Sequence, residues 1–174
     1  MDLLQLDRTR KRRLFHLVFA LGMGVVVGFA AADALAREIP ETLTDLSFVA
    51  VLGGSLVAIR RYQRDDLAYR IGLPLVGLSF LMAVAIGSGQ GTVLYWLYYL
   101  PLMYLFFLGK TEGLILSLLF TAALALLLAN PLQWDIFPYE RGHILRFLFS
   151  YLFVVVLAYA LEASRSRMSA LLSA

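Results

Sequence analysis

Side chains that commonly carry out catalysis or bind metals are scarce in this sequence. The 174 residues include two histidines, His16 and His143, and no cysteine, which excludes disulfides, thiol catalysis and thiolate metal sites. No His-Glu-x-x-His zinc motif is present, and Gly109-Lys110-Thr111 lacks the upstream glycine of a phosphate-binding loop, so we interpret it as a short turn. We therefore expect no catalytic residues, no cofactor and no metal in this chain.

The residues best suited to bind a ligand are aromatic or polar, and they lie in two apolar segments. One segment runs from Tyr95 to Tyr104 and contains Pro101, which we expect to kink a helix and expose the carbonyl of Leu97. The other begins at His143, where spacings of three and four residues place polar side chains on one helix face. The candidate ligand-binding residues are Tyr95, Tyr98, Tyr99, Tyr104, His143, Arg146 and Ser150.

The composition indicates that a lipid bilayer surrounds these segments. Hydrophobic residues make up 61% of the chain, charged residues make up 16%, and the mean hydropathy is +0.80. Globular proteins average about 45–50% apolar and about 25% charged residues. A soluble domain of this size cannot bury so many apolar side chains, which argues against a soluble enzyme, a nucleic-acid-binding module and a disordered tail. We expect membrane lipids, and no nucleic acid, as partners.

The uncharged runs predict an all-α, polytopic membrane protein with six transmembrane helices. A membrane-spanning helix needs about 20 apolar residues. The run from 71 to 109 is nearly twice that length, and Gly87-Ser88-Gly89-Gln90-Gly91 predicts a tight reversal inside it. We divide it into helices of about 69–87 and 92–108. The other uncharged runs are residues 14–32, 46–59, 113–134 and 147–161.

The basic residues predict that both termini lie in the cytoplasm. Lysine and arginine collect in cytoplasmic loops, and with six spans twelve of the fifteen fall on the side that holds both termini. The basic start, the apolar residues 14–29 and the small residues 30–36 also resemble a signal peptide. We favour a retained first helix because the apolar stretch is long for a signal peptide. The expected outer connections, residues 37–45 and 130–142, are too short to form a ligand-binding domain.

Two interpretations of the aromatic segment stay open in this topology. Tyrosine hydroxyls around a proline kink suit a lipophilic or amphiphilic ligand, with Arg146 meeting an acidic or carbonyl group. Alternatively, the aromatic side chains form a belt at headgroup depth, and Arg146 is an interfacial anchor. The belt explains Tyr95 and Trp96 better than Tyr99 and Tyr104, which lie deeper in the same predicted helix.

The last predicted helix continues past the membrane. No glycine or proline follows Glu162, and Leu161, Met168 and Leu171 have the spacing that begins a coiled coil. An unbroken helix of this kind could carry a movement out of the membrane. The alternative is an amphipathic tail that lies on the bilayer. The expected signalling-helix residues are Glu162, Arg165, Met168, Leu171 and Leu172.

Three segments, residues 94–109, 146–151 and 158–165, resemble the six-helix membrane input regions of bacterial GGDEF diguanylate cyclases and of some sensor histidine kinases. The resemblance covers roughly the second half of the chain. It implies location in the bacterial inner membrane, and a last helix that passes through a coiled coil into a dimeric cytoplasmic output domain. No GGDEF or kinase segment occurs in this sequence, and the resemblance assigns no binding residue.

We therefore expect residues 1–163 to form a transmembrane sensor domain and residues 164–174 to begin a cytoplasmic signalling helix. The expected function is to receive a lipophilic signal and regulate a C-terminal diguanylate cyclase, which synthesises cyclic di-GMP, in a homodimer. The alternative is a stand-alone small membrane protein, either the substrate-binding subunit of a transporter or an assembly scaffold.

Overall fold

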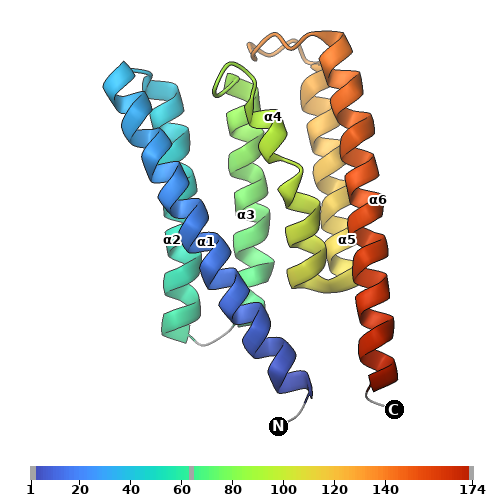
Figure 1. Ribbon diagram of the computed structural model, residues 1–174. Helices are drawn as coiled ribbons and strands as arrows, with labels where there is room; N and C mark the ends of the chain where they lie inside the picture. The colour runs from blue at the N-terminus through green and yellow to red at the C-terminus, as the bar shows by residue number, and fades with distance from the viewer. Residues whose placement is uncertain (1–2, 63–64, 173–174) are drawn as a thin grey trace. The chain divides into compact units, whose positions relative to one another are not determined.

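Helices form all the regular structure that is seen. The computed structural model describes the backbone of residues 3–62 and 65–172, and the side chains of residues 12–61 and 66–168. No β-strand occurs in this part of the chain, which confirms the all-α prediction. The helices, in chain order, are α1 (Leu3–Ala36), α2 (Ile39–Tyr62), α3 (Asp65–Ile86), α4 (Val93–Trp96), α5 (Tyr99–Ala129) and α6 (Arg141–Leu172) (Figure 1).

Among the described residues, five helical stretches are long and apolar enough to cross a membrane. Their most apolar windows have mean hydropathies between 1.7 and 2.2, yet only 17% to 44% of the residues in each window are buried. So much exposed apolar surface needs lipid to cover it, and the chain is a multi-pass membrane protein. The five stretches are Arg12–Ala36, Ile39–Arg61, Asp66–Ile86, Val93–Ala129 and Arg141–Met168.

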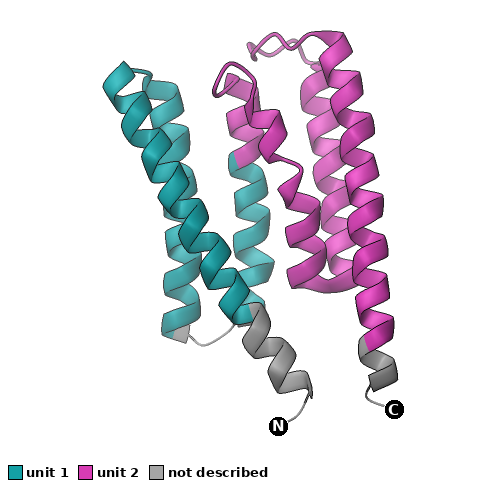
Figure 2. Cartoon of the chain, viewed as in Figure 1, with its two compact units in different colours: residues 1–79 teal, residues 80–174 magenta. Residues whose placement is uncertain are grey.

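The chain divides into two compact units, residues 1–79 and 80–174, with the boundary inside α3 (Figure 2). In the first unit, α1 packs along α2. The rings of Phe15 and Phe19 stack with centroids 3.7 Å apart, and Phe15 lies 4.8 Å from the ring of Tyr69 on α3. Gly72 of α3 lies directly against Ser55 of α2. A small residue at Gly72 therefore lets these two helices approach closely.

In the second unit, α5 consists of two arms that meet at Gly109. This glycine has φ +82°, a conformation that L side chains rarely adopt. Beyond the turn, the position of a side chain at Gly113 falls against the backbone of Tyr104 and Leu105, so the two arms run back along each other (Figure 1). The predicted turn is therefore real, but it is confined to Gly109, because Lys110–Gly113 are already helical.

The prediction of a single helix over about 92–108, kinked at Pro101, was wrong, because two helices cover these residues. α4 ends at Trp96, and α5 begins at Tyr99. Pro101 falls in the first turn of α5, where a missing N–H costs little. The carbonyl of Leu97 is not exposed as expected, because it accepts a hydrogen bond from the Leu100 N–H at 3.0 Å. The chain avoids the orphaned carbonyl by ending one helix and starting another.

The expected connections were too long in the first half of the chain. α2 begins at Ile39, so only Arg37 and Glu38 separate it from α1 instead of residues 37–45. Arg60, which follows the uncharged run 46–59, and Arg70, which precedes the run from 71, lie within α2 and α3. The reason is that a helix satisfies its own backbone and does not have to stop where charged side chains begin. The reversal expected at residues 87–91 is confirmed, since α3 ends at Ile86 and the three glycines that follow have positive φ.

Replacing Gly113 tests the close approach of the two arms of α5. We expect Gly113→Ala to lower the thermal unfolding midpoint, at a cost of about 1–3 kcal/mol. The added Cβ would lie 2.5 Å from the Tyr104 carbonyl oxygen and 2.6 Å from the Leu105 Cα, and backbone atoms cannot rotate away. Gly28→Ala is the matched control, because a Cβ at Gly28 meets no atom within 4 Å. Equal midpoints for the two variants would contradict the hairpin.

Candidate functional site

The predicted tyrosines differ sharply in exposure. Tyr104 has no exposed surface and faces the Phe120 ring at 6.3 Å, whereas Tyr95 and Tyr99 are 69% and 59% exposed. Tyr98 is half-buried, and its ring lies 5.3 Å from Phe147 of α6. The aromatic segment therefore has a packed side and an exposed side, and Tyr98 lies between them.

Two of the seven predicted ligand-binding residues line one surface depression. The link between α4 and α5 supplies Tyr98, and α6 supplies Ser150. The depression measures about 470 Å³ and is wide open, and its other walls are apolar: Phe149, Phe153 and Val154. A hydroxyl on each side of an apolar groove suits an amphiphilic molecule better than a small polar one.

His143 and Arg146 lie in the first two turns of α6, and both side chains are exposed. The His143 Nδ1 is 3.4 Å from the Glu140 Oε2, in a pair whose side chains are 69% and 75% exposed. Such an exposed pair contributes little to stability. Neither His143 nor Arg146 lines the depression beside Tyr98.

Two buried hydroxyls in the second unit receive no hydrogen bond from the described residues. They belong to Tyr104 and Tyr151, whose side chains have no exposed surface. The Phe120 ring lies 6.3 Å from Tyr104 and 6.2 Å from Tyr151, so the three rings form one cluster. Buried hydroxyls without partners are uncommon and costly. Sequence reasoning missed Tyr151, although it follows Phe147 by one helical turn.

A short segment between α5 and α6 covers the end of α3. The Phe137 N–H donates to the Ala85 carbonyl, and the Tyr139 hydroxyl donates to the Val84 carbonyl, each at 2.9 Å. These carbonyls belong to the last turn of α3, where a helix runs out of its own N–H donors, and the Val84 carbonyl also accepts from the Gly87 N–H at 3.1 Å. Burial raises the pKa of Tyr139 to about 12, so its hydroxyl stays protonated and available as a donor. Sequence reasoning did not single out this segment.

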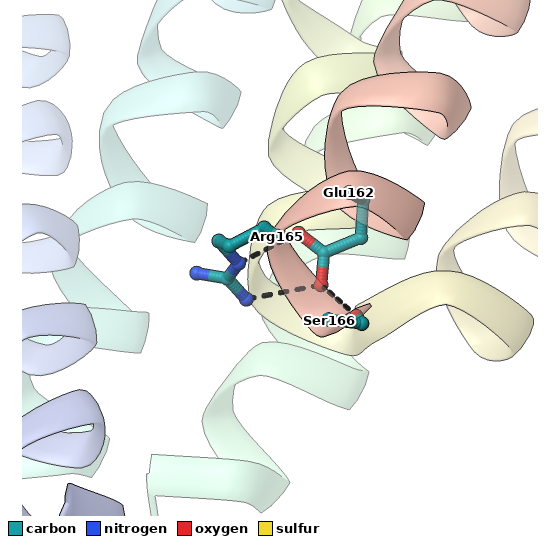
Figure 3. A network of polar contacts seen from close by, with 3 residues as sticks. All are labelled: Glu162, Arg165 and Ser166. Carbon is teal, nitrogen blue, oxygen red and sulfur yellow. Dashed lines mark hydrogen bonds and ion pairs between the residues drawn. The ribbon is translucent and has the colours of Figure 1, made fainter. Parts of the chain in front are cut away.

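A compact polar network lies near the end of α6 (Figure 3). Glu162 is 6% exposed, and its two carboxylate oxygens each lie 3.0 Å from a nitrogen of Arg165. The Ser166 hydroxyl lies 3.5 Å from Oε1 of the same carboxylate. Two parallel N–H···O contacts are the strong, orientation-specific form of an arginine–carboxylate pair.

The same arginine reaches across to α5. Its guanidinium carbon lies 4.7 Å from the centroid of the Phe106 ring, in the arm of α5 that precedes Gly109. A cation over an aromatic face is attracted to it, and more strongly where water is excluded. We call Phe106, Glu162, Arg165 and Ser166 the exit latch. It joins the end of α6 to α5 through one side chain.

Three of the five signalling-helix residues have described side chains. Glu162 and Arg165 belong to the exit latch, and Met168 is 60% exposed. Leu171 and Leu172 belong to α6, but their side chains lie outside the described residues. The spacing of three between Glu162 and Arg165 could have predicted their ion pair, whereas nothing in the sequence pointed to Phe106.

The apolar helices define a multi-pass membrane domain, and the exit latch lies near the end of its last helix, α6. Residues 5–172 match the MASE6 family, and the chain belongs to that family. MASE families are membrane-associated sensory domains of bacterial signalling proteins, and the chain is a sensory domain of this kind. No curated protein and no solved structure matches the chain.

Removing the cation of the exit latch tests the energetic coupling of its two charges. We expect Arg165→Met to lower the unfolding midpoint, because the buried Glu162 carboxylate loses its counter-ion. Adding Glu162→Gln to this variant restores part of the loss, since the uncompensated charge is then gone. Arg167→Met, an exposed arginine of the same helix, is the control. A double variant less stable than Arg165→Met would contradict the coupling.

Proposed function

We propose that this sensory domain crosses the bacterial inner membrane six times and keeps both termini in the cytoplasm. The reversal at Gly109 supports an even number of crossings, because the fourth apolar stretch then enters and leaves on the same side. The distribution of lysine and arginine supports the orientation, with twelve of the fifteen on the cytoplasmic side of this topology.

In this proposal, α6 regulates a C-terminal output domain, a diguanylate cyclase that makes cyclic di-GMP. Membership of a family of bacterial signalling sensors supports an output partner. The continuity of α6 supports transmission of the signal along this helix, because α6 runs without a break from Arg141 to Leu172. Two copies of the chain associate as a homodimer through a coiled coil that begins after Glu162.

The signal is a lipophilic or amphiphilic molecule that reaches the protein from the lipid. It enters the depression that Tyr98 and Ser150 line. The other exposed candidate residues lie on the helices α4, α5 and α6, and they are Tyr95, Tyr99, His143 and Arg146. Tyr98 also packs against Phe147, so a ligand that displaces Tyr98 changes a contact with α6. A ligand shifts a conformational equilibrium only when it binds the two conformations with different affinity. In this proposal the two conformations differ in the contact between Tyr98 and Phe147.

The exit latch is the observation that carries the proposal. It fixes α6 to α5 at the last position before the helix leaves the second unit's packed core. Movement of α6 at Phe147 must either be transmitted through the latch or break it. The contact between Arg165 and Phe106 is formed or broken when α6 moves relative to α5, which suits a two-state signal.

A cysteine cross-linking scan tests the signalling helix. Single cysteines are introduced from Ser164 to Ser173 in the full-length protein, and residues 1–174 contribute no cysteine of their own to the background. We expect cross-linking between two copies to recur with a helical period and to change when the signal is added. A scan without periodicity would contradict the coiled coil. A gene that stops after the codon for Ala174 would favour the stand-alone membrane protein instead.

Single substitutions test the ligand site. We expect Tyr98→Ala to reduce the response of the output activity to the signal, because Tyr98 lines the depression. We expect the same of Arg146→Ala, because Arg146 is exposed on α6 one helical turn before Ser150. Tyr104→Phe tests the buried hydroxyl of the aromatic cluster in the same assay. Met82→Ala, which alters an exposed side chain of α3, is the control. An unchanged response in all three variants would remove the proposed site.

A further inference from the structure

A basic depression lies on α1 where its membrane-spanning stretch begins. It measures about 510 Å³ and is open to the surroundings. The described residues that line it all belong to α1, and they are Arg12, Arg13, His16 and Leu17. No acidic side chain is among these described residues. The depression therefore combines two permanently charged guanidinium groups with an apolar wall.

A hydrogen bond holds the His16 ring beside Arg12. The His16 Nδ1 lies 2.8 Å from the Arg12 carbonyl oxygen. A carbonyl oxygen can only accept, so Nδ1 carries a hydrogen and donates it. The other ring nitrogen, Nε2, takes no part in this bond and donates to an anion when the ring is protonated. Guanidinium groups match the geometry of phosphate oxygens, so this end of the depression suits a phosphate group.

An exposed apolar row continues along α1 from the depression. Arg13, Leu17 and Leu21 follow one another at intervals of four residues, which places them on one face of the helix. Leu17 and Leu21 are 57% and 65% exposed. A molecule whose phosphate group lies at Arg13 therefore meets apolar side chains along the helix. This sequence of charged and apolar groups matches a phospholipid better than a soluble phosphate compound.

We propose that the depression is a binding site for one anionic phospholipid. The phosphate group contacts Arg12, Arg13 and His16, and an acyl chain lies along Leu17 and Leu21. Residues 8–13 include five basic side chains and no acidic one, and such clusters beside a transmembrane helix are typical of binding to anionic lipids. The site belongs to the first unit alone and does not depend on the output domain. Only the leaflet that supplies the lipid rests on the proposed topology.

Quenching by brominated lipids measures the preference of this site. A bimane fluorophore is attached to Val25→Cys, the next position in the apolar row, in the full chain of 174 residues, which has no other cysteine. The chain is placed in phosphatidylcholine nanodiscs that contain either brominated phosphatidylglycerol or brominated phosphatidylcholine at the same mole fraction. We expect the phosphatidylglycerol to quench more strongly. A fluorophore on Leu43→Cys, near the other end of the α1–α2 pair, should be quenched equally by both lipids.

Matched variants assign the preference to the depression. We expect Arg13→Gln to lower the relative affinity for phosphatidylglycerol about fivefold. Arg61→Gln removes an exposed arginine of α2 at the same end of the helix pair, and it should leave the affinity unchanged. If Arg13→Gln loses helical circular dichroism, Leu17→Gln gives a second comparison, because it disturbs the apolar wall and keeps every charge.

Two outcomes would overturn the proposal. Equal losses in Arg13→Gln and Arg61→Gln would show that the preference arises from diffuse positive charge and not from the depression. Loss of the preference when soluble glycerol phosphate is added would show that the depression binds a free phosphate group instead of a lipid.

Discussion

The contact of Arg165 with the Phe106 ring links the end of the chain's last helix to α5, and the buried Glu162 carboxylate of the same helix holds this arginine. Where the last helix leaves the lipid, its charged side chains lie at the edge of the apolar region. An isolated charge buried there is costly. Glu162 and Arg165 solve this problem by neutralising each other, with the arginine also lying against the Phe106 ring. The position of α6 is therefore defined where the helix leaves the packed unit. A sensory domain that acts through α6 depends on this fixed position of the helix.

Other buried polar groups also need partners, and the fold supplies them in different ways. The last carbonyls of α3 are satisfied by Phe137 and Tyr139. The carbonyl opposite Pro101 is satisfied because α4 ends and α5 begins again at Tyr99. Buried polar atoms that stay without partners, the hydroxyls of Tyr104 and Tyr151, gather in the aromatic cluster beside α6.

The sequence predicts the helices well, because apolar length and glycine spacing act locally. The turn at residues 87–91 and the reversal at Gly109 follow from glycine's access to positive φ. The break at Leu97 was missed, because proline at the first turn of a new helix and proline in a kink look alike in sequence. Half of the exit latch was predictable but was not predicted: the spacing of Glu162 and Arg165 is local, whereas Phe106 reaches Arg165 only through the hairpin of α5.

The most direct test measures whether α6 is held by the latch. Spin labels at Leu102 of α5 and Met168 of α6, both exposed, report the separation of the two helices in the full-length protein in nanodiscs. The account predicts one narrow distance distribution for the unaltered chain and a broad one for Arg165→Met. Identical distributions in the two proteins would contradict it, because α6 would then be positioned by something other than the latch.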